Sequence, residues 1–200
     1  MNFPTSRKTL VIILHEIYGL NEHILAFGDK VSRSGYEVLT PNLLIRGPFP
    51  YEQEEEAYSY FVNQIGFDRA VDEVNQIVRD HRDRYDCIMI VGFSIGATIA
   101  WRCSGSGIDG IIGYYGSRIR SYAEMEPKCP ALLFFASNEK SFDVSELSEK
   151  LEHRRNTHVH VIEGEHGFMN PYSKSYFPQA YQACLEMSFN FLRRVAKREV

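Results

Sequence analysis

Short apolar runs alternate with longer amphipathic stretches from one end of this chain to the other. Six apolar runs are predicted to be strands: Thr9–Leu14, Glu37–Thr40, Cys87–Val91, Gly110–Gly113, Ala131–Ala136 and His158–Ile162. Several are apolar at consecutive positions, which is typical of parallel strands covered by helices on both faces. The stretches predicted to be helices are Glu22–Arg33, Glu52–Gln64, Phe67–Arg82, Ile95–Cys103, Val144–Leu151 and Gln179–Lys197. Since each helix is long enough to return the chain to a parallel strand, the pattern predicts a mostly parallel, doubly wound α/β sheet.

The length of 200 residues fits one domain, so residues 1–200 are expected to form a single unit. A chain of this size buries about 70% of the surface that its unfolded form exposes, and its core needs neither a disulfide nor a metal. The cysteines are Cys87, Cys103, Cys129 and Cys184. They form no Cys-x-x-Cys pair and no cluster with histidine at metal-ligand spacing, so a role in the core is expected.

Charge and hydropathy narrow the possible partners. Lys and Arg number 22 against 26 Asp and Glu, and the net charge of −4 gives no electrostatic reason to bind nucleic acid or an anionic membrane. No segment approaches the roughly 18 apolar residues of a membrane span. The first apolar run, Leu10–Leu14, is predicted to be a buried strand rather than a signal peptide. The expected location is the cytoplasm.

The most direct chemical signal is a Gly-x-Ser-x-Gly motif at residues 92–96. A predicted strand leads into it and a predicted helix leaves it, which is the setting that a nucleophilic serine requires. A sharp turn would project the Ser94 hydroxyl above the sheet, and Gly92 and Gly96 would let strand and helix approach without Cβ clashes. The backbone N–H of Ile95 would then lie at a helix N-terminus, where negative charge is stabilised. The alternative is a structural turn whose serine caps the helix.

A serine hydroxyl is a weak nucleophile and needs a neighbouring histidine to take its proton. In α/β-hydrolases the chain order is serine, acid, histidine. Of the seven histidines, His166 lies well beyond Ser94 in a glycine-flanked loop that follows a predicted strand, whereas His158 and His160 alternate with valines within that strand. Position and order favour His166 as the base over an ordinary turn residue.

The acid is expected in the loop after Ala131–Ala136, where Glu139 and Asp143 lie. Asp143 stands three residues before Glu146 at the start of a predicted helix, which is the spacing of a capping box and gives Asp143 a structural role. Glu139 has no such role and lies closer to the strand. Either residue type can orient a histidine, and Glu139 is favoured, with Asp143 as the alternative.

Four stretches together resemble the dienelactone hydrolase family. They are His15–Gly19, residues 92–96, Gly113–Gly116 and His166–Phe168. The resemblance extends from about residue 9 to the C-terminal helix, and the combination is more specific than any one motif. It implies a compact α/β-hydrolase fold without a large lid, and an activity that cleaves esters or lactones of small molecules.

Carried over by position, the resemblance also implies roles for individual residues. Ser94 aligns with the family nucleophile, Glu139 with the acid and His166 with the base. The backbone N–H groups of Ile17 and Ile95 would form the oxyanion hole.

Glu16 matches a further residue of the family, one that lies beside the nucleophile and helps to set its protonation state. The alternative is that Glu16 is a loop carboxylate that caps the next helix.

The sequence also departs from the family pattern. The lactone-cleaving members use cysteine in place of Ser94 and aspartate in place of Glu139. Because serine has a far higher pKa than cysteine, a histidine base becomes obligatory. The arginines that hold a substrate carboxylate in those enzymes have no secure match: Arg46 and Arg118 are candidates, with surface arginine as the alternative.

These features predict a carboxylic ester hydrolase that works by two-step acyl transfer. His166, oriented by Glu139, removes the proton from Ser94, and water later releases the acid. No metal or cofactor is implied. The expected partner is a small-molecule ester, and the protein is expected to be a monomer or a homodimer. A thioesterase or small peptidase with the same triad, and a non-catalytic α/β-hydrolase scaffold, are the alternatives.

Overall fold

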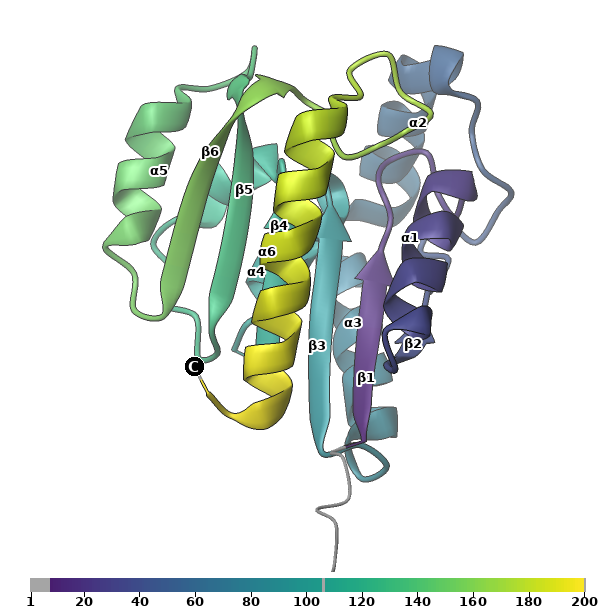
Figure 1. Ribbon diagram of the computed structural model, residues 1–200. Helices are drawn as coiled ribbons and strands as arrows, with labels where there is room; N and C mark the ends of the chain where they lie inside the picture. Colours follow the sequence, from purple (N-terminus) through teal and green to yellow (C-terminus); the bar gives the residue numbers. More distant parts are fainter. Residues whose placement is uncertain (1–7, 106, 200) are drawn as a thin grey trace, which may run out of the picture.

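A single parallel sheet organises the chain (Figure 1). The computed structural model describes residues 8–105 and 107–199, and within them six strands pair in parallel in the order β2-β1-β3-β4-β5-β6. The strands are β1 (Thr9–Leu14), β2 (Glu37–Leu39), β3 (Cys87–Phe93), β4 (Gly110–Tyr114), β5 (Ala131–Asn138) and β6 (Thr157–Glu165). The α-helices are α1 (Glu22–Arg33), α2 (Glu54–Tyr60), α3 (Gly66–Arg82), α4 (Ile95–Cys103), α5 (Val144–Glu152) and α6 (Pro178–Lys197). The predicted α/β class is confirmed, and no large lid lies over the described residues.

Helices cover both faces of the sheet. Figure 1 shows α1 and α6 on the same side of it, whereas α3, α4 and α5 pack on the other. Because successive strand side chains point to opposite faces, β1 contributes to two cores. Leu10, Ile12 and Leu14 pack with α3 and α4, and Val11 and Ile13 pack with α1. This two-sided burial explains why the strand is apolar at every position from Leu10 to Leu14.

The stretch predicted as one helix over Glu52–Gln64 is divided in the structure. It consists of the 3₁₀ turn η1 (Tyr51–Gln53), then α2, then the π-helical turn η2 (Phe61–Ile65). Gly66, with φ of 72°, then changes the chain direction into α3, a conformation that glycine adopts without a steric penalty. A further 3₁₀ turn, η3 (Ser117–Tyr122), was not predicted.

The cysteines lie in the core, as expected. All four are buried, and burial raises the pKa of Cys103, Cys129 and Cys184 to about 12, so these three are neutral thiols at ordinary pH. Among the described residues, no helix has the length and apolar character needed to cross a membrane.

Two glycines allow β3, α4 and β1 to meet. A Cβ atom on Gly92 would lie 2.2 Å from the backbone oxygen of Gly96, so any side chain at this position would collide with the first turn of α4. A Cβ atom on Gly96 would lie 2.5 Å from the Leu14 oxygen and 2.8 Å from the His15 oxygen. These contacts are with backbone, which cannot rotate aside. The first turn of α4 can therefore pack this closely against β3 and the end of β1 because both positions are glycine.

Replacing Gly96 with alanine tests this close packing. We expect Gly96→Ala to lower the free energy of unfolding by about 1–3 kcal/mol, because the added methyl group must displace the backbone of β1. Gly105→Ala is the matched control, since no atom lies within 4 Å of the position that its Cβ would take. Urea denaturation of both variants measures the difference. Equal stability would show that the approach of α4 to β1 does not depend on glycine.

Candidate active site

The residues predicted to carry the chemistry lie at one edge of the sheet. Ser94 follows β3, Glu139 follows β5, His166 follows β6, and Glu16 and Ile17 follow β1. Because the strands are parallel, their carboxyl ends share this edge, which is where ligands bind in open α/β sheets. All five residues line one cleft of about 700 Å³.

Ser94 occupies a strained turn between β3 and α4. Its backbone has φ of 53° and ψ of −112°, a combination that a residue with a side chain rarely adopts. Its N–H donates to the carbonyl oxygen of Tyr114 at 2.9 Å, which holds the turn against β4. The hydroxyl makes no capping hydrogen bond to α4, so the alternative of a helix-capping serine is wrong. Instead, Ser94 Oγ lies 2.9 Å from His166 Nε2.

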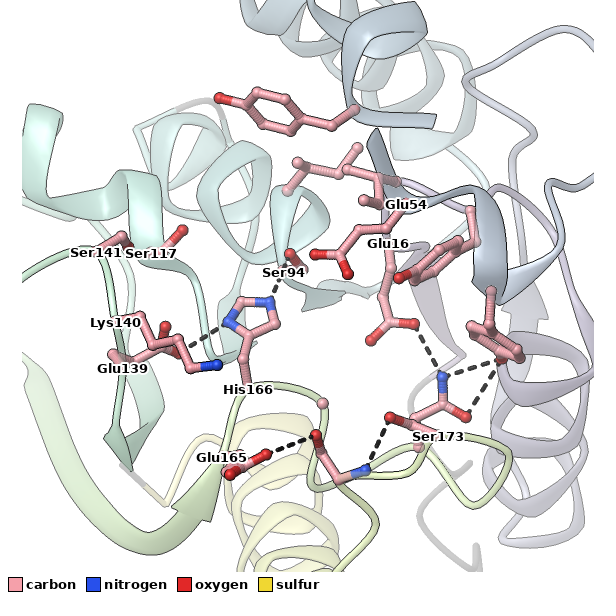
Figure 2. Close-up of a pocket in the computed structure, with 18 of the residues that line it drawn as sticks. Glu16, Glu54, Ser94, Ser117, Glu139, Lys140, Ser141, Glu165, His166 and Ser173 are labelled. Atoms are coloured by element: carbon pink, nitrogen blue, oxygen red, sulfur yellow. Dashed lines mark hydrogen bonds and ion pairs between the residues drawn. The ribbon is translucent and has the colours of Figure 1, made fainter. Parts of the chain in front are cut away.

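His166 connects the serine to a carboxylate, as Figure 2 shows. Its Nδ1 lies 2.8 Å from Oε1 of Glu139, whose side chain is only 4% exposed. A carboxylate accepts hydrogen bonds, so this contact places the ring proton on Nδ1 and leaves Nε2 to accept from the Ser94 hydroxyl. The ring also packs against Tyr115, with the ring centres 4.8 Å apart.

Asp143, the alternative acid, has a different role. Its Oδ1 accepts hydrogen bonds from the backbone N–H groups of Ser145 at 2.9 Å and Glu146 at 3.1 Å, so it caps the N-terminus of α5. Of the two carboxylates, Glu139 is therefore the one that is hydrogen-bonded to His166.

Ile17 and Ile95, whose N–H groups are predicted to form the oxyanion hole, line the same cleft. Ile95 is the first residue of α4, and Ile17 lies in the loop after β1. Neither N–H donates to another described residue. The close contact at Gly96 holds the first turn of α4 against this end of β1, so the two donors come from adjoining segments. Their role in catalysis stays a prediction.

Glu16 lies beneath the cleft and is only 4% exposed. Its carboxylate accepts hydrogen bonds from the Tyr115 hydroxyl at 2.9 Å and from Asn170 Nδ2 at 3.0 Å, and His23 Nδ1 lies 3.6 Å away. Burial by itself would raise the pKa of Glu16, but His23, Tyr115 and His166 outweigh it and hold this pKa below its usual value. Glu16 is therefore an anion with two hydrogen-bond donors fixed around it.

The alternative role for Glu16, capping the next helix, is wrong. Asn21 caps α1, since its Oδ1 accepts from the N–H of Ile24 at 3.3 Å.

The two candidate arginines differ in position. Arg46 is exposed, lies outside the cleft lining and stacks over the rings of Phe49 and Tyr60 at 3.7 and 5.1 Å. Arg118 lines the cleft and donates a hydrogen bond to the Tyr58 hydroxyl. Arg118 is therefore the one of the two that is placed to meet a ligand.

Asn170 was not predicted from the sequence. It is 1% exposed and hydrogen-bonds Glu16 from the loop after β6. No local pattern marks this asparagine, apart from its place four residues after His166. Within the described residues, no group of three or more His, Cys, Asp or Glu side chains could hold a metal ion.

Comparison with known proteins gives a consistent family assignment. A sequence model described as "Dienelactone hydrolase family" matches residues 2–196. A Bacillus subtilis protein, the uncharacterized YczH, is 41% identical over 177 residues, which is 86% of each chain. The dienelactone hydrolase-like promiscuous phosphotriesterase P91 from metagenomic libraries has a TM-score of 0.76, with 12% identity over 96% of this chain and 88% of its own. Est1E of Butyrivibrio proteoclasticus, solved with ferulic acid bound, has a TM-score of 0.64, with 13% identity over 94% and 90% of the two chains.

A pair of substitutions separates the two carboxylates. We expect Glu139→Gln to lower kcat by about 10⁴-fold, because an amide can hold His166 in the wrong tautomer. Asp143→Asn should keep most of the activity, since asparagine also caps helices well. Steady-state hydrolysis of a p-nitrophenyl ester measures both. A larger loss in Asp143→Asn than in Glu139→Gln would assign the acid to Asp143.

Proposed function

Since this chain belongs to the dienelactone hydrolase family and is a carboxylic ester hydrolase, we propose that it cleaves small-molecule esters or lactones through a Ser94-His166-Glu139 triad. The observation that carries the proposal is the continuous hydrogen-bonded series from Ser94 Oγ through His166 to Glu139, at 2.9 and 2.8 Å. Nucleophile, base and orienting acid are thus within reach of one another without any rearrangement.

In the first step, Ser94 Oγ attacks the ester carbonyl while His166 Nε2 takes its proton. The Glu139 carboxylate stabilises the positive charge that develops on the imidazole and keeps the ring in the productive orientation. The N–H groups of Ile17 and Ile95 bind the oxygen of the tetrahedral intermediate; one such donor lowers the barrier by about 2.7–4 kcal/mol. Collapse of the intermediate expels the alcohol, which takes the proton from His166, and leaves Ser94 acylated.

In the second step, His166 removes a proton from water, and the hydroxide attacks the acyl group on Ser94. The same two N–H groups bind the second tetrahedral intermediate. His166 then returns the proton to Ser94 Oγ as the carboxylic acid leaves.

The cleft suits a substrate of modest size. Its volume of about 700 Å³ falls in the range of small-molecule sites. Several of the lining residues are tyrosines: Tyr18, Tyr51, Tyr58 and Tyr172. These aromatic rings, each with a polar hydroxyl, can pack against the acyl or alcohol part of a small ester.

The proposal is tested by covalent labelling and turnover together. The wild-type protein should react with a fluorophosphonate probe and hydrolyse short p-nitrophenyl esters. Ser94→Ala and His166→Ala should lose labelling, with kcat lower by roughly four to six orders of magnitude. His153→Ala is the matched control and should keep full activity, because this exposed histidine contacts its own helix at the Glu149 carbonyl.

Two outcomes would contradict the proposed function. One is a wild-type protein that neither labels nor hydrolyses any ester. The other is a Ser94→Ala protein that keeps wild-type turnover. A preference for thioesters or amides over the matched oxygen ester would keep the triad but reassign the substrate class.

A further inference from the structure

Asn170 forms a buried hydrogen-bonding centre in the wall of the cleft, where the residue is only 1% exposed. Its side-chain Nδ2 donates to Glu16 Oε2 at 3.0 Å, and its Oδ1 accepts from the backbone N–H of Tyr172 at 3.0 Å. The Tyr51 hydroxyl lies 3.0 Å from Nδ2 and 3.3 Å from Oδ1, and it also accepts from Asn21 Nδ2 at 3.0 Å. One amide therefore connects segments that lie 154 and 119 residues away along the chain.

The backbone of Asn170 shapes the turn that carries His166. Its N–H donates to the Gly167 carbonyl at 2.9 Å, and its own carbonyl accepts from Ser173 at 3.0 Å. Gly167 has φ of 92°, so the chain reverses immediately after His166. The side chain of Asn170 thus holds this turn against Glu16, and Glu16 precedes Ile17 in the loop after β1.

We propose that Asn170 is a positioning residue, which sets the distance between the loop of the base His166 and the loop of the oxyanion donor Ile17. This inference rests on the proposed function of the cleft. A displacement of about 1 Å between a catalytic group and its partner can cost about 100-fold in rate, so such a contact affects turnover without touching the substrate. Tyr115 also links the two loops, through its ring against His166 and its hydroxyl on Glu16. The effect of losing Asn170 is therefore partial.

The first test is Asn170→Ala, assayed on p-nitrophenyl acetate. We expect kcat to fall about 10- to 100-fold with KM changed less than threefold, because alignment is lost while Asn170, only 1% exposed, presents almost no surface to the substrate. The rate of fluorophosphonate labelling should fall in parallel, since it requires the same alignment of Ser94, His166 and the oxyanion donors.

Asn170→Asp is the second test and is nearly isosteric. It keeps the acceptor for the Tyr172 N–H but places a carboxyl oxygen where Nδ2 faced Glu16 at 3.0 Å. Two adjacent carboxyls share a proton, and the introduced carboxyl group can again donate to Glu16 when it is protonated. We therefore expect kcat of Asn170→Asp, divided by the wild-type value at each pH, to rise at least threefold as the pH falls from about 8 to about 6.

Other ionisable groups surround the pair of residues 16 and 170. Tyr51 faces Asn170 directly, and Glu16 also faces His23, Tyr115 and His166. These groups are present in the wild-type protein as well, so division by its rate at each pH removes their direct contribution. Asn63→Asp is the matched control, because Asn63 is exposed and donates to Ser59 on the surface; its rate ratio should stay near one at every pH.

The outcomes separate positioning from other roles. An unchanged kcat in folded Asn170→Ala, or a rise in KM alone, would overturn the proposal; the second result would make Asn170 a substrate contact. If Asn170→Ala does not fold, a pH-independent ratio in Asn170→Asp would overturn it. None of these results affects the triad, which fails separately if Ser94→Ala stays active.

Discussion

The close approach of the first turn of α4 to β3 and β1 is the constraint on which the rest of the site depends. Backbone atoms occupy the space that a side chain would need at Gly92 and Gly96. This contact forces the chain to reverse sharply at Ser94, whose φ of 53° lifts the hydroxyl out of the sheet. It also holds the N-terminus of α4, with the N–H of Ile95, against the end of β1 and the loop of Ile17. One steric requirement thus positions both the proposed nucleophile and its proposed oxyanion donors.

The parallel sheet supplies the remaining groups, because its carboxyl ends bring distant loops to one edge. His166 is 72 residues from Ser94 and 27 residues from Glu139, yet both contacts are shorter than 3 Å. Burying carboxylates is costly unless they are hydrogen-bonded, and both buried acids here satisfy this requirement. Glu139 accepts from His166, and Glu16 accepts from Tyr115 and Asn170. These pairings fix the loops relative to one another as well as stabilising the charges.

Much of this arrangement could be predicted from local patterns. The apolar runs marked all six strands, and the capping-box spacing gave Asp143 the helix-capping role that it has in the structure. The division of the segment before Gly66 was not predicted, because an apolar helical pattern does not mark where a 3₁₀ or π-helical turn replaces the α-helix. The contacts of Glu16 were missed for a similar reason. They join residues that are 99 and 154 positions apart in the sequence. One of them comes from an asparagine in the loop between β6 and α6, which no local pattern marks.

In the proposed mechanism, Ser94 becomes acylated during turnover. Rapid acid quenching during the hydrolysis of an activated ester, followed by intact-mass and peptide mass spectrometry, detects this intermediate. We expect one added acyl group per chain, located on the peptide that contains Ser94 and present within the first turnover. An acyl group on a different residue, or rapid turnover with no acylated protein at any time, would contradict this mechanism.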